Sequence, residues 1–457
     1  MSLTDRDQRL HVAVVGAGPV GLDLALLMAR RCPQWRVSLF DARALEADIR
    51  HDPRTLALSL GSVQLLRQLG AWPLEGTQPI LRVQVSQESP AMALAGSRPE
   101  VNIRALELGV PELGAVLAHG TLVPALQRAW QAEQALAPDR LHHRFGQAVR
   151  GLKVVASLGP NGGPARRVEV DAGVAEAFDL AVVAEGGVFM RDAHRSEVDI
   201  DETITPSAGE PVGPVPDHSP LGAFQQWRRR WDTREIRHDY RQTAWVGTVG
   251  LSGAEPGFAV ERFTRQGPVA LLPLPPAVGT EGPALSRASL VWCVDSDPDP
   301  VARLNDAQRM AVLNALLPPQ AGRIEHIGPL KSFPLGLLAQ TSLVRGGCLV
   351  RIGNAAQTLH PVAGQGLNLG LRDAHALVER LRNAQRRGES VAQALAHVDW
   401  ARAADRWSMI AATDFLARSF TWALPGAATA RALGLLAVEH LPGLKPALAR
   451  QMMFGRR

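Results

Sequence analysis

Three closely spaced glycines stand where a buried segment turns into a helix, a pattern suited to holding a flat ligand. They are Gly364, Gly366 and Gly370, and they follow the apolar residues Leu349, Val350 and Ile352 and a histidine–proline pair. Glycine lets the backbone approach a ligand without a clash at Cβ. The start of a helix adds unpaired N–H groups and a partial positive charge. The segment is therefore predicted to meet an anionic or electron-rich ligand edge, although alone it could also be a tight strand-to-helix turn.

A second glycine motif near the start of the chain makes the purely structural interpretation weaker. Gly16, Gly18 and Gly21 form a G-x-G-x-x-G sequence between the apolar run 12–15 and the helical stretch 22–30. In such a turn the first glycine makes the bend, the second admits a pyrophosphate and the third lets helix and strand pack closely. The pattern predicts a dinucleotide site.

An acidic residue lies where a dinucleotide site needs one. The predicted strand 36–40 ends at Asp41, about 20 residues beyond the last glycine of the loop, the spacing of the carboxylate that meets the adenosine ribose. The second glycine segment follows more than three hundred residues later. A nicotinamide-only site is normally completed sooner, so the distance favours a long, extended cofactor, and FAD fits.

These segments resemble the flavoprotein aromatic hydroxylases related to para-hydroxybenzoate hydroxylase, and among them the ubiquinone-biosynthesis hydroxylases of the 2-polyprenyl-6-methoxyphenol hydroxylase branch. The resemblance runs through most of the chain. It is carried by the first glycine loop and by residues 54–62, 181–186, 261–273, 333–335 and 348–372. The sequence Gly-Asn-Ala-Ala-Gln-Thr-Leu-His-Pro at 353–361 is specific to this branch, since other relatives have Gly-Asp-Ala-Ala-His.

The resemblance implies non-covalently bound FAD. The residues implied to hold it are Gly16, Gly18, Gly21, Asp41, Arg54, Glu185, Gly186, Gly353, Asn354, Gly364, Gln365, Gly366, Leu367 and Asn368. Arg54 is expected at the phosphates or the ribityl chain, a task that suits a guanidinium. Glu185 and Asn354 stand where most of the wider family has aspartate. Asparagine keeps an acceptor for a ribityl hydroxyl, and glutamate keeps the charge.

The implied reaction is hydroxylation of the ring of a polyprenylated phenol in ubiquinone biosynthesis, with NAD(P)H and O₂, through a flavin C4a-hydroperoxide. The cofactor carries the difficult step, while the protein orients the ring and excludes water. His360, Pro361 and Gly364 are expected beside the reacting atoms. Arg262 and Phe263 are expected to wall the substrate cavity. His360 is either a donor to flavin or phenol, or a turn histidine satisfied by the backbone.

The expected fold is α/β, with a Rossmann-like FAD-binding domain interleaved with an antiparallel substrate sheet and followed by helices. The sheet is predicted from segments of period-two alternation such as 81–87 and 289–294. Residues 191–234 are polar and proline-rich and are predicted to form a long loop. The predicted domains are FAD-binding (1–75, 106–190 and 325–400), substrate-binding (76–105 and 191–324) and C-terminal helical (401–457).

Composition limits the cellular compartments and binding partners expected for the protein. The three scattered cysteines are expected to be buried free thiols in a reducing compartment. No metal-ligand spacing occurs, and no apolar run reaches the ~18 residues of a membrane span, so a cytoplasmic location is expected. The net charge is +5, but arginines are spread along the chain and Tyr240 is the only tyrosine, which disfavours nucleic-acid binding.

The basic C-terminal stretch has two interpretations. An amphipathic helix around Arg418 to Arg431 would dock on the anionic inner face of a membrane or on partners in a ubiquinone-synthesis complex. Alternatively, the stretch packs against the FAD-binding domain or forms a contact between copies in a homo-oligomer. Two other functions also stay open: an FAD-dependent reductase or dehydrogenase of an isoprenoid or quinone, and a non-catalytic flavoprotein-like subunit.

Overall fold

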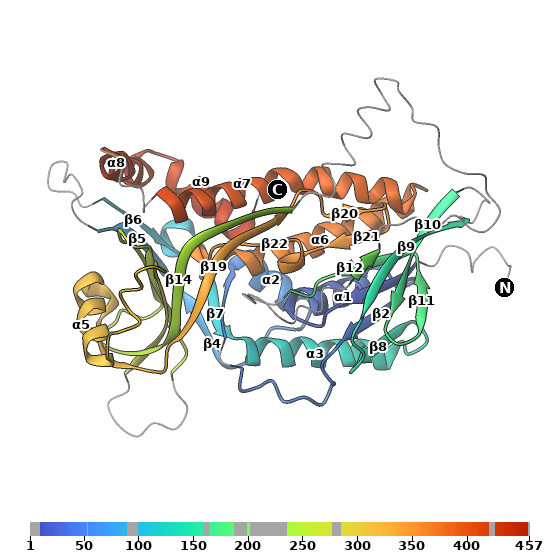
Figure 1. The fold of residues 1–457 in the computed structure, drawn as a ribbon, viewed down its shortest axis with the longest axis horizontal. Coiled ribbons are helices and arrows are strands. Elements are labelled where there is room, and N and C mark those ends of the chain that lie inside the picture. Colours follow the sequence, from blue (N-terminus) through green and yellow to red (C-terminus); the bar gives the residue numbers. More distant parts are fainter. Residues whose placement is uncertain are drawn as a thin grey trace.

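The chain forms a mixed α/β structure in which a parallel sheet with its helices lies beside a large, mostly antiparallel sheet (Figure 1). The computed structural model describes residues 10–52, 54–88, 99–158, 164–186, 199–201, 235–276, 285–419 and 426–455. Of the loop predicted over 191–234, only the short strand β13 (Asp199–Asp201) belongs to this part of the chain. The rest of that prediction lies outside the described residues.

The parallel sheet forms from apolar runs that are buried on both faces. Its strands, in spatial order, are β20 (Val344–Arg345), β21 (Leu349–Arg351), β12 (Leu180–Val183), β1 (His11–Val15), β2 (Arg36–Asp41) and β8 (Leu141–Phe145). Only β20 runs antiparallel to its neighbour among these strands. Buried parallel strands read as continuous apolar sequence because both faces need apolar side chains.

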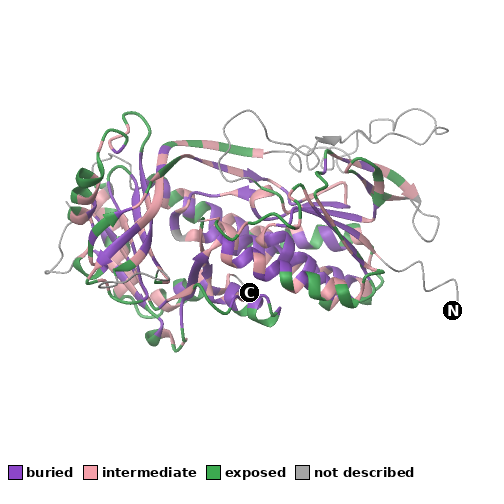
Figure 2. Ribbon diagram, turned by 90° about the horizontal axis from the view of Figure 1, so that it is seen from below, coloured by how far each residue is buried: buried purple, intermediate pink, exposed green. Residues whose placement is uncertain are grey.

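Period-two alternation divides these side chains between two covering layers. Val12 and Val14 belong to the core shared with α1 (Pro19–Arg31), α3 (His119–Leu136) and α6 (Gln365–Arg386). Ala13 and Val15 face a smaller sheet, ordered β11 (Ala175–Phe178), β10 (Pro164–Asp171), β9 (Gly151–Leu158) and β13. Much of the helical layer is purple in Figure 2, which shows how deeply it is buried.

The larger sheet supplies the expected substrate layer. Its order is β22 (Gln357–Thr358), β19 (Lys331–Gln340), β14 (Glu235–Ser252), β17 (Ser286–Asp295), β16 (Pro268–Leu274), β15 (Phe258–Phe263), β5 (Arg82–Gln87) and β6 (Glu100–Arg104), with β18 (Arg323–Ile327) also paired to β14. One face packs on α5 (Asp306–Leu316). The other packs on α2 (Leu60–Gln68), on the C-terminal helices and on a small sheet of β3 (Thr55–Ser59), β7 (Gly114–Ala118) and β4 (Thr77–Ile80).

The domain limits stay a prediction, and strand pairing crosses them in two segments. The sequence placed 325–400 in the FAD-binding domain, yet β19 pairs with β14 along most of its length and β22 extends the same sheet. Residues 76–105 were placed in the substrate domain, yet β4 pairs with β7 in the small sheet. Hydrogen-bonded pairing decides to which sheet a strand belongs, and this pairing does not change at the residues where the sequence pattern changes.

Among the described residues, three C-terminal helices follow α6, and a short segment with a proline–glycine pair separates the last two. They are α7 (Val391–Ser419), α8 (Ala427–His440) and α9 (Leu444–Phe454). Of the helix expected around Arg418 to Arg431, Arg418 lies on α7 and Arg431 lies on α8, and residues 420–425 between them lie outside the described residues. Helix α8 runs along β6, where the backbone N–H of Asn102 donates to Glu439 Oε2 at 2.8 Å.

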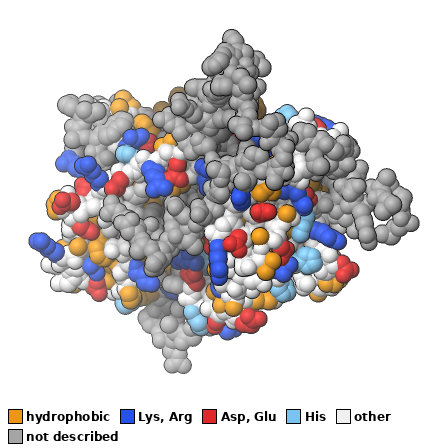
Figure 3. Space-filling model, turned by 45° about the vertical axis from the view of Figure 1, so that its right-hand side comes forward, with side chains coloured by type: hydrophobic (Ala, Val, Ile, Leu, Met, Phe, Trp, Pro, Cys, Tyr) orange, Lys and Arg blue, Asp and Glu red, His pale blue; other side chains and the backbone are white. Residues whose placement is uncertain are grey.

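Within the described ranges, no helix is both long and apolar enough to cross a membrane, and no group of three or more metal-binding side chains occurs. Cys32, Cys293 and Cys348 are buried free thiols, as the sequence predicted. Burial raises the pKa of Cys32 to about 12 and that of Cys348 to about 11. On the face shown in Figure 3, visible lysine and arginine side chains lie among acidic ones and do not form one continuous basic patch.

Candidate cofactor and active site

The carboxyl ends of the parallel strands bring four sequence-predicted segments to one edge. Val15 lies opposite Phe40 on β2 and opposite Val183 on β12, and Val183 lies opposite Arg351 on β21. Gly16, Asp41, Glu185 and Gly353 follow these positions at once or after one or two residues. Ligands of open α/β sheets bind at this edge.

Each glycine of the first loop has its own structural role. Gly16 has φ of +101°, and a Cβ there would lie 2.9 Å from the Glu185 backbone. A Cβ at Gly21 would lie 1.8 Å from the Gly16 carbonyl oxygen, so α1 packs directly on the turn. A Cβ at Gly18 would meet no described atom within 4 Å. Gly18 also precedes α1 without a capping side chain from the described residues, leaving the N-terminus of α1 open to an anion.

The second glycine loop presents another open helix start. Helix α6 begins at Gln365, and Gly364 precedes it in a left-handed conformation with φ of +58°. No side chain among the described residues caps it. A Cβ at Gly366 would approach nothing described more closely than Asn354 Oδ1, at 4.0 Å.

The two loops meet although they lie far apart in sequence. A Cβ at Gly370 would come within 2.8 Å of Val20 Cγ2, and one at Gly353 would come within 3.2 Å of the same methyl group. Gly186 lies against Asn354, whose Cβ would be 2.4 Å from a Cβ on that glycine. The N-termini of α1 and α6 therefore belong to one continuous surface.

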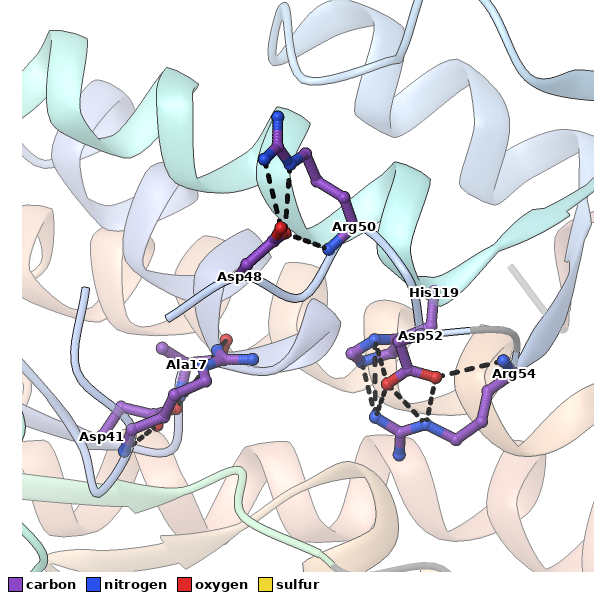
Figure 4. Close-up of polar contacts among 8 residues, drawn as sticks. Ala17, Asp41, Asp48, Arg50, Asp52, Arg54 and His119 are labelled. Atoms are coloured by element: carbon purple, nitrogen blue, oxygen red, sulfur yellow. Dashed lines mark hydrogen bonds and ion pairs between the residues drawn. The ribbon is translucent and has the colours of Figure 1, made fainter. Parts of the chain in front are cut away.

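Asp41 fixes the first loop through its side chain. Its Oδ2 accepts the Ala17 N–H at 2.7 Å and its Oδ1 accepts the Arg43 N–H at 2.8 Å (Figure 4). The Arg43 guanidinium donates to the Ala17 carbonyl oxygen at 3.2 Å. Glu185 follows β12 at the same edge of the sheet, and desolvation, and to a smaller degree the charge of Asp41, raises its pKa.

Arg54 is held by a partner that the sequence analysis missed. Its Nη2 lies 2.6 Å from Asp52 Oδ2 and 3.3 Å from His119 Nε2 (Figure 4). Burial, reinforced by Arg54, lowers the pKa of His119 to about 4. The missed signal was the repeat Asp-x-Arg at 41–43, 48–50 and 52–54, in which each aspartate also accepts the N–H two residues on.

His360 adopts the geometry of the structural alternative. The N–H of Val362 donates to its Nδ1 at 3.3 Å, which leaves the proton on Nε2 to donate to Gln242 Oε1 at 3.0 Å. Burial lowers the pKa of His360 to about 4, so the ring is neutral at pH 7. Its ring packs edge-on to Tyr240, with centroids 5.1 Å apart. Pro361 and Gly364 close the same turn, with the Gly364 N–H donating to the Pro361 carbonyl at 3.1 Å.

The side chain of Asn368 is held by other parts of the protein, and its expected cofactor contact stays a prediction. Its Oδ1 accepts from the Ser59 N–H and the Ser62 hydroxyl, both at 2.8 Å. Its Nδ2 donates to the carbonyls of Ala57 and Gly364, both at 3.0 Å. An amide side chain has four hydrogen-bonding positions, and all four are used: three join α6 to β3 and α2, and the fourth returns to Gly364 at the start of α6.

Only one of the two expected substrate-wall residues faces the candidate site. Phe263 is buried against Val362 of the second loop. Arg262, the preceding residue on β15, donates to Ser86 Oγ at 3.4 Å on the opposite face of the sheet. Successive side chains of a strand point to opposite faces, so the expectation for Arg262 is corrected.

Comparison with known proteins identifies the family. The FAD binding domain family matches residues 290–413. Ubiquinone hydroxylase UbiL of Rhodospirillum rubrum is 31% identical over 98% of this chain and 90% of its own length. The 3-demethoxyubiquinol 3-hydroxylase of Escherichia coli is 28% identical over 96% of this chain and 97% of its own length.

The fold has a solved counterpart in p-nitrophenol 4-monooxygenase PnpA of Pseudomonas putida. The two share a TM-score of 0.62 at 14% identity, over 98% of this chain and 99% of that one. At this identity the likeness concerns the fold, which is the para-hydroxybenzoate hydroxylase-like fold expected from the sequence. Taken with the length and identity of the relatives, the chain belongs to the family of FAD-dependent ubiquinone-biosynthesis hydroxylases and is an FAD-dependent monooxygenase.

Proposed function

We propose that the enzyme hydroxylates the aromatic ring of a polyprenylated phenol, using NAD(P)H and O₂. The observation that carries the proposal is the single surface that joins the open N-termini of α1 and α6. An extended FAD spans such a surface, whereas a smaller nucleotide would need only one of the two helix starts. The relatives named as ubiquinone-pathway hydroxylases support the substrate class.

The residues present fit FAD and divide its parts among themselves. The N-terminus of α1 beyond Gly18 would hold the pyrophosphate, and Asp41 would face the adenosine ribose. Glu185 and Asn354 would meet the central part of the cofactor. When bound, FAD supplies the oxygen chemistry. The N–H groups at the start of α6 would stabilise negative charge on the ring.

The protein's own contribution at the ring is to orient the substrate and exclude water. Phe263 and Val362 form an apolar contact between β15 and the second loop. Neutral His360 holds the turn through its bond to Gln242 of β14. This arrangement would set the substrate sheet at a fixed position relative to the flavin ring, a requirement for reaction within a dry site.

Oxygen labelling tests the reaction. FAD-loaded protein, NADPH and a short-tailed prenyl phenol under ¹⁸O₂ are expected to yield product with one labelled oxygen atom. Label that enters only from water would contradict a monooxygenase reaction on this substrate. Oxygen-independent reduction of an isoprenoid or quinone would favour the reductase, and failure to bind FAD would favour the non-catalytic subunit.

We also propose that α8 and α9 contact the membrane that holds the long-tailed substrate. Leu433, Leu441, Leu444 and Leu448, on α8, on α9 and in the turn between them, are 38–55% exposed, and exposed apolar surface is typical of interaction sites. Arg418 and Arg431 are weaker probes than the sequence suggested. Arg418 pairs with Asp414, and Arg431 donates to the Ser419 carbonyl.

Replacing both Leu441 and Leu444 by aspartate is expected to reduce co-sedimentation with anionic vesicles, because charge is excluded from the lipid interface. Activity on a long-tailed phenol should fall, while activity on a short-tailed soluble phenol should stay unchanged. The matched control replaces Leu74 and Leu136, which are 101% and 82% exposed elsewhere, by aspartate. Equal effects of the two double variants would show that α8 and α9 have no special role at the membrane.

A further inference from the structure

The segment that leads into the second glycine loop contains β22, which is a terminal strand of the large substrate sheet. Residues of β22 pair with β19, with Ala339 opposite Gln357 and Leu338 opposite Thr358. The Gln340 N–H donates to the Ala356 carbonyl at 2.8 Å. The segment from Gly353 to Gly364 is thus tied to the substrate sheet on one side.

A fully buried arginine of α7 holds the same segment from behind. Arg406 is 0% exposed. Its Nε donates to Gln357 Oε1 at 2.9 Å and its Nη2 donates to the Gln340 carbonyl at 2.8 Å. One guanidinium therefore bridges the loop, the substrate sheet and the C-terminal helical region, which suits its rigid fork of donors.

The bridge continues into α6, whose N-terminus faces the proposed ring site. Gln357 Nε2 donates to Asp373 Oδ2 at 3.1 Å, and Asp373 Oδ1 accepts from Arg402 Nε at 2.8 Å. Arg402 Nη2 lies 2.7 Å from Asp405 Oδ2, which also accepts from Arg372 Nε at 3.1 Å. All five side chains are buried or nearly so. Networks of this kind hold one geometry only when their members are paired.

A second contact from α7 reaches the other end of the loop. Tyr240 donates its hydroxyl proton to Asp414 Oδ1 of α7 at 3.1 Å, and its ring packs on His360. Helix α7 therefore contacts the loop directly at Gln357 and, through Tyr240, at His360. The turn that carries Pro361 and Gly364 follows directly after His360.

We propose that Arg406 is a positioning residue, through which α7 fixes the loop 353–364 and so sets the place of the flavin ring relative to the substrate sheet. The inference rests on the assignment of this loop to the flavin ring. It adds a role that no glycine motif contains, because Arg406 acts only through Gln357 and the Gln340 carbonyl.

The test compares Arg406→Met with Leu313→Ala. Leu313 is buried on α5, on the far face of the substrate sheet, and its truncation lowers stability without touching the loop. Hydrogen exchange of the FAD-free protein is measured first. Arg406→Met should speed exchange of the amides in 353–364 by roughly tenfold to a hundredfold, since hydrogen bonds from a charged donor are strong, while Leu313→Ala should not.

The FAD-loaded variants are then compared by FAD dissociation constant and by the fraction of NADPH electrons released as hydrogen peroxide. Arg406→Met should weaken FAD binding about tenfold, a change of ~1.4 kcal/mol, and raise peroxide release. Arg406→Lys, which keeps the charge but not the fork, should be intermediate, and it decides the matter by the same measures if Arg406→Met does not fold. If the Arg406 variants resemble Leu313→Ala in loop exchange, FAD binding and peroxide release, the proposed positioning role of Arg406 is wrong. Faster loop exchange with unchanged FAD binding and peroxide release shows instead that the loop does not hold the flavin ring.

Discussion

Replacing Gly18 by valine is expected to give a folded protein that no longer retains FAD. No described atom lies within 4 Å of a Cβ at this position, so the substitution should leave the packing of α1 intact. The added methyl groups would occupy the open N-terminus of α1, where the pyrophosphate must approach. Flavin absorbance relative to protein absorbance after purification should fall to background, while the melting temperature should match that of the natural protein without FAD, because bound FAD itself stabilises the folded state.

Gly21→Ala is the matched comparison because it fails for a different reason. Its Cβ would lie 1.8 Å from the Gly16 carbonyl oxygen, so the helix and the turn cannot both keep their places. This variant should lose stability whether or not FAD is present. A Gly18→Val protein that keeps one FAD per chain would refute the proposed placement of the pyrophosphate.

Asp23→Leu is expected to stabilise the protein by about 1–3 kcal/mol, the usual cost of a buried polar group without a partner. Asp23 is 0% exposed within α1, and neither carboxylate oxygen has a hydrogen-bond partner among the described residues. Burial raises the pKa of Asp23 well above its ordinary value. Urea unfolding of the two proteins measures the difference.

The carboxyl group of Asp23 also makes the stability of the folded protein depend on pH. Because the folded pKa lies above the unfolded one, the folded state binds the proton more tightly, and stability from this group is complete below the unfolded pKa. It is lost as pH rises through the folded pKa. The advantage of Asp23→Asn over the natural chain should therefore grow from pH 5 to pH 8. The exposed control Asp139→Asn should show no such growth, and a constant difference for Asp23→Asn would contradict the buried charge.

The sequence predicted best those features that depend on the backbone alone. The geometry of the Gly16 loop, the place of Asp41 at the end of β2 and the helix start near Gly366 follow from local rules about φ, Cβ space and spacing. These rules need no knowledge of distant partners. The arrangement of the strands at one edge follows as well, since parallel strands share the direction of their carboxyl ends.

What the sequence could not predict depends on pairing between distant residues. Arg262 and Phe263 are neighbours in sequence, and only the parity of β15 relative to the second loop decides which of them faces the site. The sequence indicates a cofactor contact for Asn368, and only the structure reveals that Ser59 and Ser62 donate to its side-chain oxygen. Such bonds join residues more than three hundred positions apart, and no local pattern marks them.

The position of α8 along β6 has a consequence for the whole molecule. β6 ends the order of the large sheet in the described part of the chain, and the outer edge of a terminal strand is a template for pairing with another chain. Glu439 occupies the Asn102 N–H, and the Ala428 carbonyl accepts from Gln87 of the neighbouring strand at 3.1 Å. Helix α8 therefore covers the outer edge of β6 and prevents another chain from pairing with it. A chain shortened before Ala427 would be prone to aggregate through this uncovered strand edge.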